Sequence, residues 1–145
     1  MQNSIKFYAL LAAIAFGLNW LWEMAQMFAF EIKPEDGLGK IFLFCTLAAV
    51  IDALVTIGIY VLLMKFNLAN RKVFYPLTIL LGAICAVGFE LFALRFELWS
   101  YNRTMPVVPF LEVGLLPLIQ LTTFVPLAIW LANRIVCRPV GSLKI

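Results

Sequence analysis

Long apolar stretches separated by short polar segments dominate the chain. Four stretches are long enough to cross the hydrocarbon core of a bilayer, which takes about 20 predominantly apolar residues in a helix. These predicted spans cover residues 7–30, 41–64, 74–98 and 110–133. Because the connections between them are short, neighbouring helices are expected to run antiparallel. The pattern therefore predicts an all-α fold: one transmembrane domain over residues 1–145, folded as an up-down four-helix bundle.

Lys and Arg residues concentrate at one end of this predicted bundle. Seven lie in the N-terminal segment, the second connection and the C-terminal tail: Lys6, Lys65, Arg71, Lys72, Arg134, Arg138 and Lys144. The other two connections carry three: Lys33, Lys40 and Arg103. Cytoplasmic loops of membrane proteins carry the excess of Lys and Arg. The distribution predicts that both termini are cytoplasmic and that the chain is a multi-pass protein of the cell's inner (cytoplasmic) membrane.

Composition supports the membrane class and excludes several functions. The chain is 64% hydrophobic and 13% charged, against about 45–50% apolar and about 25% charged residues in soluble domains. It contains no His, which excludes His-ligated haem, His-containing zinc sites and Ser/His or Cys/His catalysis. The net charge of +3 forms no basic stripe, so no nucleic-acid partner is expected.

The three cysteines show no metal-binding or redox spacing. Cys45, Cys85 and Cys137 form no CxxC pair. This favours apolar buried thiols over a disulfide or a metal site, and no cofactor is predicted.

Polar side chains recur inside the predicted spans at helical spacing. The first span carries Asn19, Glu23 and Gln26 on one face, and the second carries Asp52, Thr56 and Tyr60. The third span carries Glu90 and Glu97, and the fourth carries Glu112 and Gln120. Glu23 and Glu90 share one depth, and Asn19, Asp52 and Gln120 share another about one turn deeper. The pattern predicts a single polar cavity in the outer half of the bundle.

Two interpretations of these polar residues remain open. Polar groups between membrane helices often act only as interhelical contacts worth about 0.6 kcal/mol each, which suits Asn19, Thr56 and Gln120. A carboxylate at the bilayer centre costs from about 2.5 kcal/mol upward and usually marks function. At the outer rim, Arg95 with Glu97 and Arg103 with Glu112 are either part of the site or plain ion pairs.

The acidic residues suggest acid–base chemistry on an amphiphile. A buried carboxylic acid can remain protonated beside an ionised neighbour, so such a pair can protonate a double bond and stabilise the resulting cation. The predicted catalytic residues are Glu23, Asp52 and Glu90. The predicted ligand-binding residues are Asn19, Trp22, Gln26, Glu97, Trp99, Tyr101 and Gln120.

Prolines shape the last connection and the fourth span. Pro106 and Pro109 predict a stiff extended crossing that enters the fourth span near Phe110. Pro117 and Pro126 are expected to interrupt the helix, the first of them close to Gln120, because proline removes a helix hydrogen bond. Two prolines that merely kink the helix are the alternative.

Two segments carry a resemblance to known proteins. Residues 19–26 (NWLWEMAQ) and 97–109 (ELWSYNRTMPVVP), followed by Gly114, Pro117 and Gln120, resemble a group of small bacterial four-span membrane proteins without an established activity. The resemblance implies a shared architecture and a shared site. A looser analogy by residue type connects the chain with membrane enzymes that modify isoprenoids, although the absence of His departs from the sterol isomerase-like pattern.

Three functions are compatible with the sequence. The first is binding or modification of a membrane lipid or isoprenoid-like amphiphile by acid–base chemistry. The second is an accessory subunit of a larger membrane complex, or a homo-oligomer, in which small residues at 11–17, Gly82 and Gly88 allow partner helices to approach closely. The third is proton or cation conduction through the same carboxyl groups. Whether the protein is an enzyme stays open.

Overall fold

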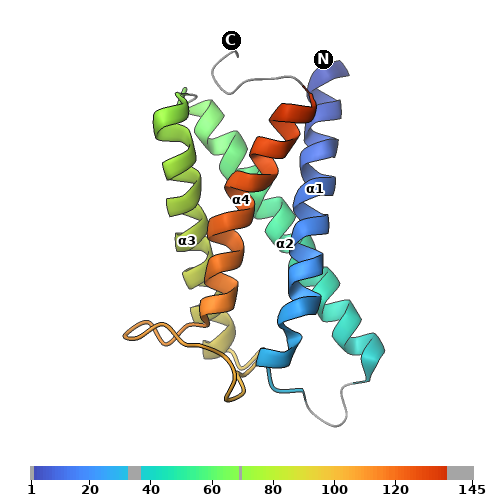
Figure 1. Cartoon of the computed structure of the whole chain (residues 1–145), viewed down its shortest axis with the longest axis vertical. Helices are drawn as coiled ribbons and strands as arrows, with labels where there is room; N and C mark the ends of the chain where they lie inside the picture. The colour runs from blue at the N-terminus through green and yellow to red at the C-terminus, as the bar shows by residue number, and fades with distance from the viewer. Residues whose placement is uncertain (1, 33–36, 69, 137–145) are drawn as a thin grey trace.

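The structure, a computed structural model, describes residues 2–32, 37–68 and 70–136 (Figure 1). Four residues named in the sequence analysis lie outside the described residues: Lys33, Cys137, Arg138 and Lys144. The elements are α1 (Gln2–Gln26), the short 3-10 helix η1 (Met27–Ala29), α2 (Leu38–Lys65), α3 (Arg71–Arg95) and α4 (Leu115–Ile135). All four α-helices are long and apolar enough to cross a membrane. The predicted all-α four-helix bundle is confirmed.

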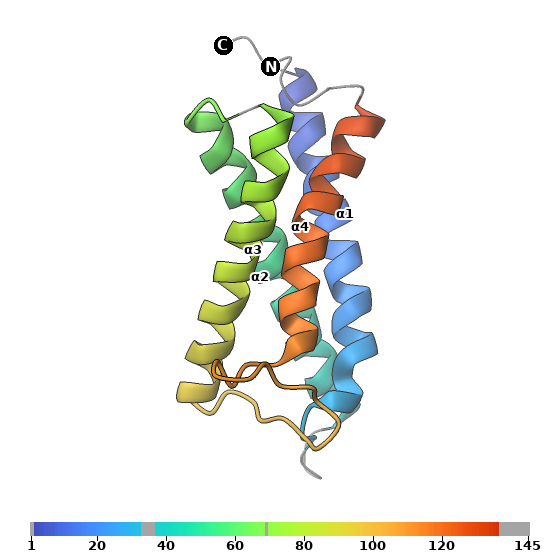
Figure 2. The same ribbon diagram turned by 60° about the vertical axis from the view of Figure 1, so that its left-hand side comes forward.

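The helices alternate in direction along the bundle. The start of α1 and the end of α4 lie at the same end, here called the inner end, and the opposite end is the outer end (Figures 1 and 2). Helix α1 packs against α2 and α4, and α3 packs mainly against α4. Helices α2 and α3 have fewer mutual contacts, although they are consecutive in the chain. Helix α4 is therefore the central element that connects α1 with α3.

The surface of the bundle is apolar along its length. Large side chains on it are more than half exposed, including Leu54 at 63% and Ile84 at 58%. A soluble monomer rarely exposes apolar patches beyond a few hundred Å². This apolar surface and the four candidate spans are those of a multi-pass membrane protein.

The inner half of the bundle is closed by apolar packing. The rings of Phe7 and Phe74 both contact the ring of Tyr60, with centroid distances of 4.9 and 6.1 Å. The side chains of Leu11 and Ile129 are fully buried as well. The buried groups with polar side-chain contacts between helices therefore lie toward the outer half.

Gly82 allows a close approach between α3 and α4. A Cβ atom at this position would lie 2.6 Å from the carbonyl oxygen of Leu121 in α4. Gly82 therefore serves packing within the chain and not the partner contact that its small size suggested. A Cβ atom at Gly17 or at Gly88 would have none of the surrounding atoms within 4 Å.

Helix α4 begins five residues later than the predicted fourth span. Residues 106–115 instead form a hairpin, in which the N–H of Val108 donates to the oxygen of Val113 at 2.9 Å and that of Leu115 to Pro106 at 2.8 Å. The chain reverses at Phe110, which has a φ of 70° and is fully exposed at the tip. The predicted extended crossing into a span at residue 110 is therefore wrong, because positive φ angles turn the chain back on itself.

Pro117 does not interrupt α4. It is the third residue of the helix, and the first four N–H groups of a helix have no intrahelical acceptor in any case. The predicted break beside Gln120 is therefore wrong. Pro126 does lie inside α4, and Pro76 lies inside α3.

Hydrogen bonds at the outer end join the segment after α1 to the connection between α3 and α4. Phe30 and Tyr101 form an isolated antiparallel bridge, and the N–H of Glu31 donates to the oxygen of Ser100 at 2.9 Å. The side chain of Asn102 donates to the oxygen of Phe30 at 3.2 Å. These contacts, here called the outer latch, hold Tyr101 against the bundle.

Candidate functional site

The side-chain amide of Gln120 lies at the centre of a polar network in the bundle interior. Gln120 is only 2% exposed. Its Nε2 lies 3.0 Å from Oδ1 of Asn19, 2.9 Å from Oε1 of Glu23 and 2.8 Å from Oδ2 of Asp52. Helices α1, α2 and α4 thus converge on one nitrogen atom, as the shared depth of Asn19, Asp52 and Gln120 predicts.

A second branch of the network runs along α1. The indole Nε1 of Trp22 donates to Oε1 of Gln26 at 3.0 Å, and Nε2 of Gln26 donates to Oε1 of Gln120 at 3.1 Å. The spacing of four residues between Trp22 and Gln26 places both side chains on one helical face. Asn19 is anchored separately, because its Nδ2 donates to the oxygen of Ala15 at 2.8 Å.

Glu90 of α3 forms a neighbouring centre. Its carboxyl group is buried and accepts a hydrogen bond from the hydroxyl of Tyr101. The Tyr101 oxygen in turn accepts from the N–H of Gly114 at 2.8 Å. The indole Nε1 of Trp99 is buried beside this carboxyl group and makes no hydrogen bond of normal geometry within the described part of the chain.

The role of Gly114 did not emerge from the sequence. A Cβ atom there would lie 3.1 Å from Sδ of Met105 and 3.2 Å from Cζ of Tyr101. A side chain at this position would require Met105 or the Tyr101 ring to shift by a few tenths of an ångström. The spacing of Gly114 and Pro117 in the resemblance motif singled out this position but did not indicate its role.

The two centres interact electrostatically although no hydrogen bond in the described ranges joins them. The charge of Glu90 acts on the carboxyl group of Asp52. The charge of Glu23 acts on the carboxyl groups of both Asp52 and Glu90. Every Lys and Arg side chain that the structure describes is exposed. No cation from the described residues therefore lies among the three interior carboxyl groups.

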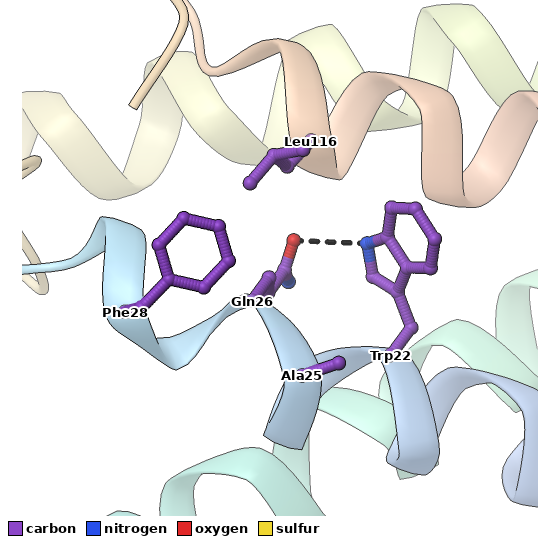
Figure 3. Close-up of a pocket in the computed structure, with 5 residues that line it drawn as sticks. All are labelled: Trp22, Ala25, Gln26, Phe28 and Leu116. Carbon is purple, nitrogen blue, oxygen red and sulfur yellow. Dashed lines mark hydrogen bonds between the residues drawn. The ribbon is translucent and has the colours of Figure 1, made fainter. Parts of the chain in front are cut away.

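A small apolar pocket opens beside the network (Figure 3). Its volume is about 110 Å³, and it is lined by Trp22, Ala25, Gln26, Phe28 and Leu116. The Gln26 amide points between the Phe28 and Trp22 rings toward α4 (Figure 3). The sequence predicted a polar cavity lined by the carboxyl groups themselves. In the structure the network is packed, and this pocket touches it through Gln26 and Trp22.

Other predicted residues lie apart from the network. The side chains of Arg95, Glu97, Arg103 and Glu112 are exposed at the outer end. Thr56 donates to the backbone oxygen of Asp52 in its own helix, at 2.9 Å. The thiols of Cys45 and Cys85 are free. Within residues 2–32, 37–68 and 70–136, no group of three or more acidic or Cys side chains is arranged to hold a metal ion.

Comparison of the chain with family models, with curated proteins and with solved structures finds no match. The resemblance to small four-span bacterial proteins therefore stays a prediction.

Proposed function

We propose that the protein binds an apolar, lipid- or isoprenoid-like amphiphile between α1 and α4 and exchanges protons with it through its interior carboxyl groups. The observation that carries this proposal is that Gln26 belongs both to the pocket and to the polar network. Its side chain lines the apolar pocket and also donates to Gln120, the centre of the carboxyl network. Apolar pockets with a few convergent polar groups are the common form of small-molecule sites.

The size of the pocket limits what it holds. Typical small-molecule sites enclose about 300–1,000 Å³, whereas this pocket measures about 110 Å³. It therefore accommodates a segment of a ligand, with the rest of an apolar chain lying along the exposed surface of the helices. Phe28 at the pocket rim is 62% exposed, so entry from the lipid side needs no opening of the bundle.

The proposed chemistry is a proton exchange at a double bond. One carboxylic acid gives its proton to one carbon, which produces a cation that the aromatic face of Trp22 stabilises. A neighbouring carboxylate removes a proton from the adjacent carbon, and the double bond shifts by one position. The number of protons on the protein is unchanged, so the step needs no further reactant.

Filling the pocket tests the binding step. Ala25→Trp places a large ring in the pocket, whereas Ala13→Trp adds the same ring at an exposed position of the same helix. After purification in mild detergent, native mass spectrometry should detect a co-purifying apolar lipid on the wild type and on Ala13→Trp. Ala25→Trp should lose it. Equal lipid on all three proteins, or none on the wild type, would contradict the proposal.

An accessory role in a membrane complex is the second candidate. The observation in its favour is the hairpin tip at Phe110, which projects a fully exposed aromatic ring at the outer end. Gly17 and Gly88 also leave room for a partner helix. The same purification decides this point, since a stoichiometric protein partner in place of a lipid supports the accessory role.

Conduction receives less support from the geometry. Beyond Gln120, the buried face of α4 continues with Leu121, Val125 and Ile129. The buried Asn133 near the inner end donates to the backbone of its own helix. Within the described residues, the polar network therefore does not continue toward the inner end.

A further inference from the structure

The hydrogen bonds from Trp22 to Gln120 have a fixed direction. An indole N–H can only donate, so the oxygen of the Gln26 amide must face Trp22, at 3.0 Å. The nitrogen of Gln26 then faces the oxygen of Gln120, at 3.1 Å. As a result, the nitrogen of Gln120 is turned toward the interior.

Asn19 is oriented from the opposite side. Its nitrogen donates to the backbone oxygen of Ala15 at 2.8 Å, so its oxygen faces Gln120 at 3.0 Å. The oxygen and nitrogen of an amide side chain are assigned from such networks. Here both ends of the network determine the same assignment, and neither Asn19 nor Gln120 can be reversed without losing a bond.

The Gln120 nitrogen carries fewer hydrogens than it has acceptors. It has two, and the three oxygens around it belong to Asn19, Glu23 and Asp52. The Gln26 amide also hydrogen-bonds the Glu23 carboxyl group, so the two amides together can serve all three oxygens. Both carboxyl oxygens lie within 2.9 Å of the same nitrogen. They are thus less than about 6 Å apart, a range in which like charges disfavour each other.

Groups on the surrounding helices do not relieve this repulsion between the two acids. Glu90 on α3 adds a third acid and is itself bonded to Tyr101. The described Lys and Arg side chains of all four helices are exposed. A proton on one of the two carboxyl groups relieves the repulsion.

We infer that Glu23 and Asp52 together carry a single proton and form the acid–base pair of the site. Gln120 is the positioning residue of this pair, and the Trp22 indole sets its orientation. The single proton follows from the short distance between the two acids and from the lack of a described cation beside them, whereas its use on a ligand rests on the proposed function. Such a pair contains both partners that a double-bond shift requires, one acid and one carboxylate.

Infrared spectroscopy of the purified protein measures the proton directly. The carboxylic-acid band of Glu90→Gln is compared with that of the variant that also carries Glu23→Gln and Asp52→Asn, at neutral and at acid pH. The difference isolates the pair from Glu90 and from the surface acids. At neutral pH it should equal half of its value at acid pH. A difference of zero, or the full value, would overturn the inference.

A second pair of variants keeps both acids and tests the role of Trp22. Trp22→Phe removes the donor that orients Gln26. Trp20→Phe is the control, because the Trp20 indole donates to Thr46 outside the network. The acid band of the pair should shift in Trp22→Phe and remain in place in Trp20→Phe. Identical bands in both would refute the orienting role. An absence of bound lipid would refute the proposed function and leave the proton count intact.

Discussion

The hydroxyl of Tyr101 donates a hydrogen bond to the buried carboxyl group of Glu90. Glu90 lies inside α3, whereas Tyr101 lies in the connection that follows it and is held in place by the outer latch. Because Gly114 at the start of α4 donates to the same hydroxyl, one phenol joins α3, the connection and α4. The packing of the outer end and the state of an interior acid are therefore linked.

Tyr101→Phe should destabilise the protein by about 1–3 kcal/mol, because it removes the hydroxyl that bonds both the Glu90 carboxyl group and the Gly114 N–H. Thermal unfolding in detergent measures the change. Tyr8→Phe is the control, since the Tyr8 ring is 38% exposed at the inner end. Equal unfolding temperatures for the two variants would show that the Tyr101 bond contributes nothing.

Glu97→Gly should stabilise the protein by about 1 kcal/mol. Glu97 lies just beyond the end of α3 with a φ of 54°, and the N–H of Leu98 donates to the oxygen of Ala93 at 2.9 Å. This helix ending favours Gly, and a non-Gly residue there costs of order 1 kcal/mol. Asn67→Gly at the matching end of α2 should gain less, since Asn tolerates this conformation. A lower unfolding temperature for Glu97→Gly would contradict the backbone argument.

Gly82→Ala and Gly88→Ala, on the same helix, should have opposite effects. The first places a Cβ 2.6 Å from the backbone oxygen of Leu121 and separates α3 from α4, with an expected loss of about 1–3 kcal/mol. The second meets open space and should be neutral or stabilising by up to about 1 kcal/mol, because Ala is the better helix former. Unfolding measured side by side tests both, and equal stability would disprove the close approach.

The spacing of polar residues predicted the centre of the polar network, because position on a helix and depth along the bundle both follow directly from residue number. Asn19, Asp52 and Gln120 do converge. The direction of each amide was not predictable, since it depends on a donor in another part of the network. The sequence predicted Trp22 as a ligand-binding residue. That its indole N–H orients the Gln26 amide follows only from the hydrogen bond between the two side chains.

The outer connection was the part that the sequence did not predict. Its hairpin turns at Phe110 and Glu112, both with positive φ. Turn prediction relies on Gly, Asn and Asp at such positions, and neither residue gives that signal. The partner of Glu90 was missed for a related reason, because Tyr101 reaches it only through the outer latch.

The orientation in the membrane can be tested by labelling single cysteines in a variant without Cys45, Cys85 and Cys137. Phe110→Cys at the exposed hairpin tip should react with an impermeant reagent on intact cells. Lys72→Cys, exposed at the start of α3 near the inner end, should react only after permeabilisation. This follows from the excess of Lys and Arg at the inner end. The reverse pattern would invert the predicted topology.

Proton exchange with the ligand is tested by isotope incorporation. The wild type is incubated with a lipid extract of its host membrane in D₂O, and mass spectrometry then measures deuterium at carbon positions of the lipids. Glu23→Gln and Asp52→Asn keep the size and the hydrogen-bonding capacity of the acids but cannot exchange a proton. Each should reduce incorporation by about 10²–10⁴-fold, the usual contribution of general acid–base catalysis.

Cys85→Ala on α3 is the control for this experiment, because it changes packing at a half-buried free thiol away from the pair. It should retain wild-type incorporation, and all variants should be compared at equal amounts of folded protein. Incorporation that survives in both Glu23→Gln and Asp52→Asn would remove the acid–base role. A protein that binds lipid yet exchanges no deuterium in the wild type would be a binding protein, with its buried acids serving only the contacts between helices.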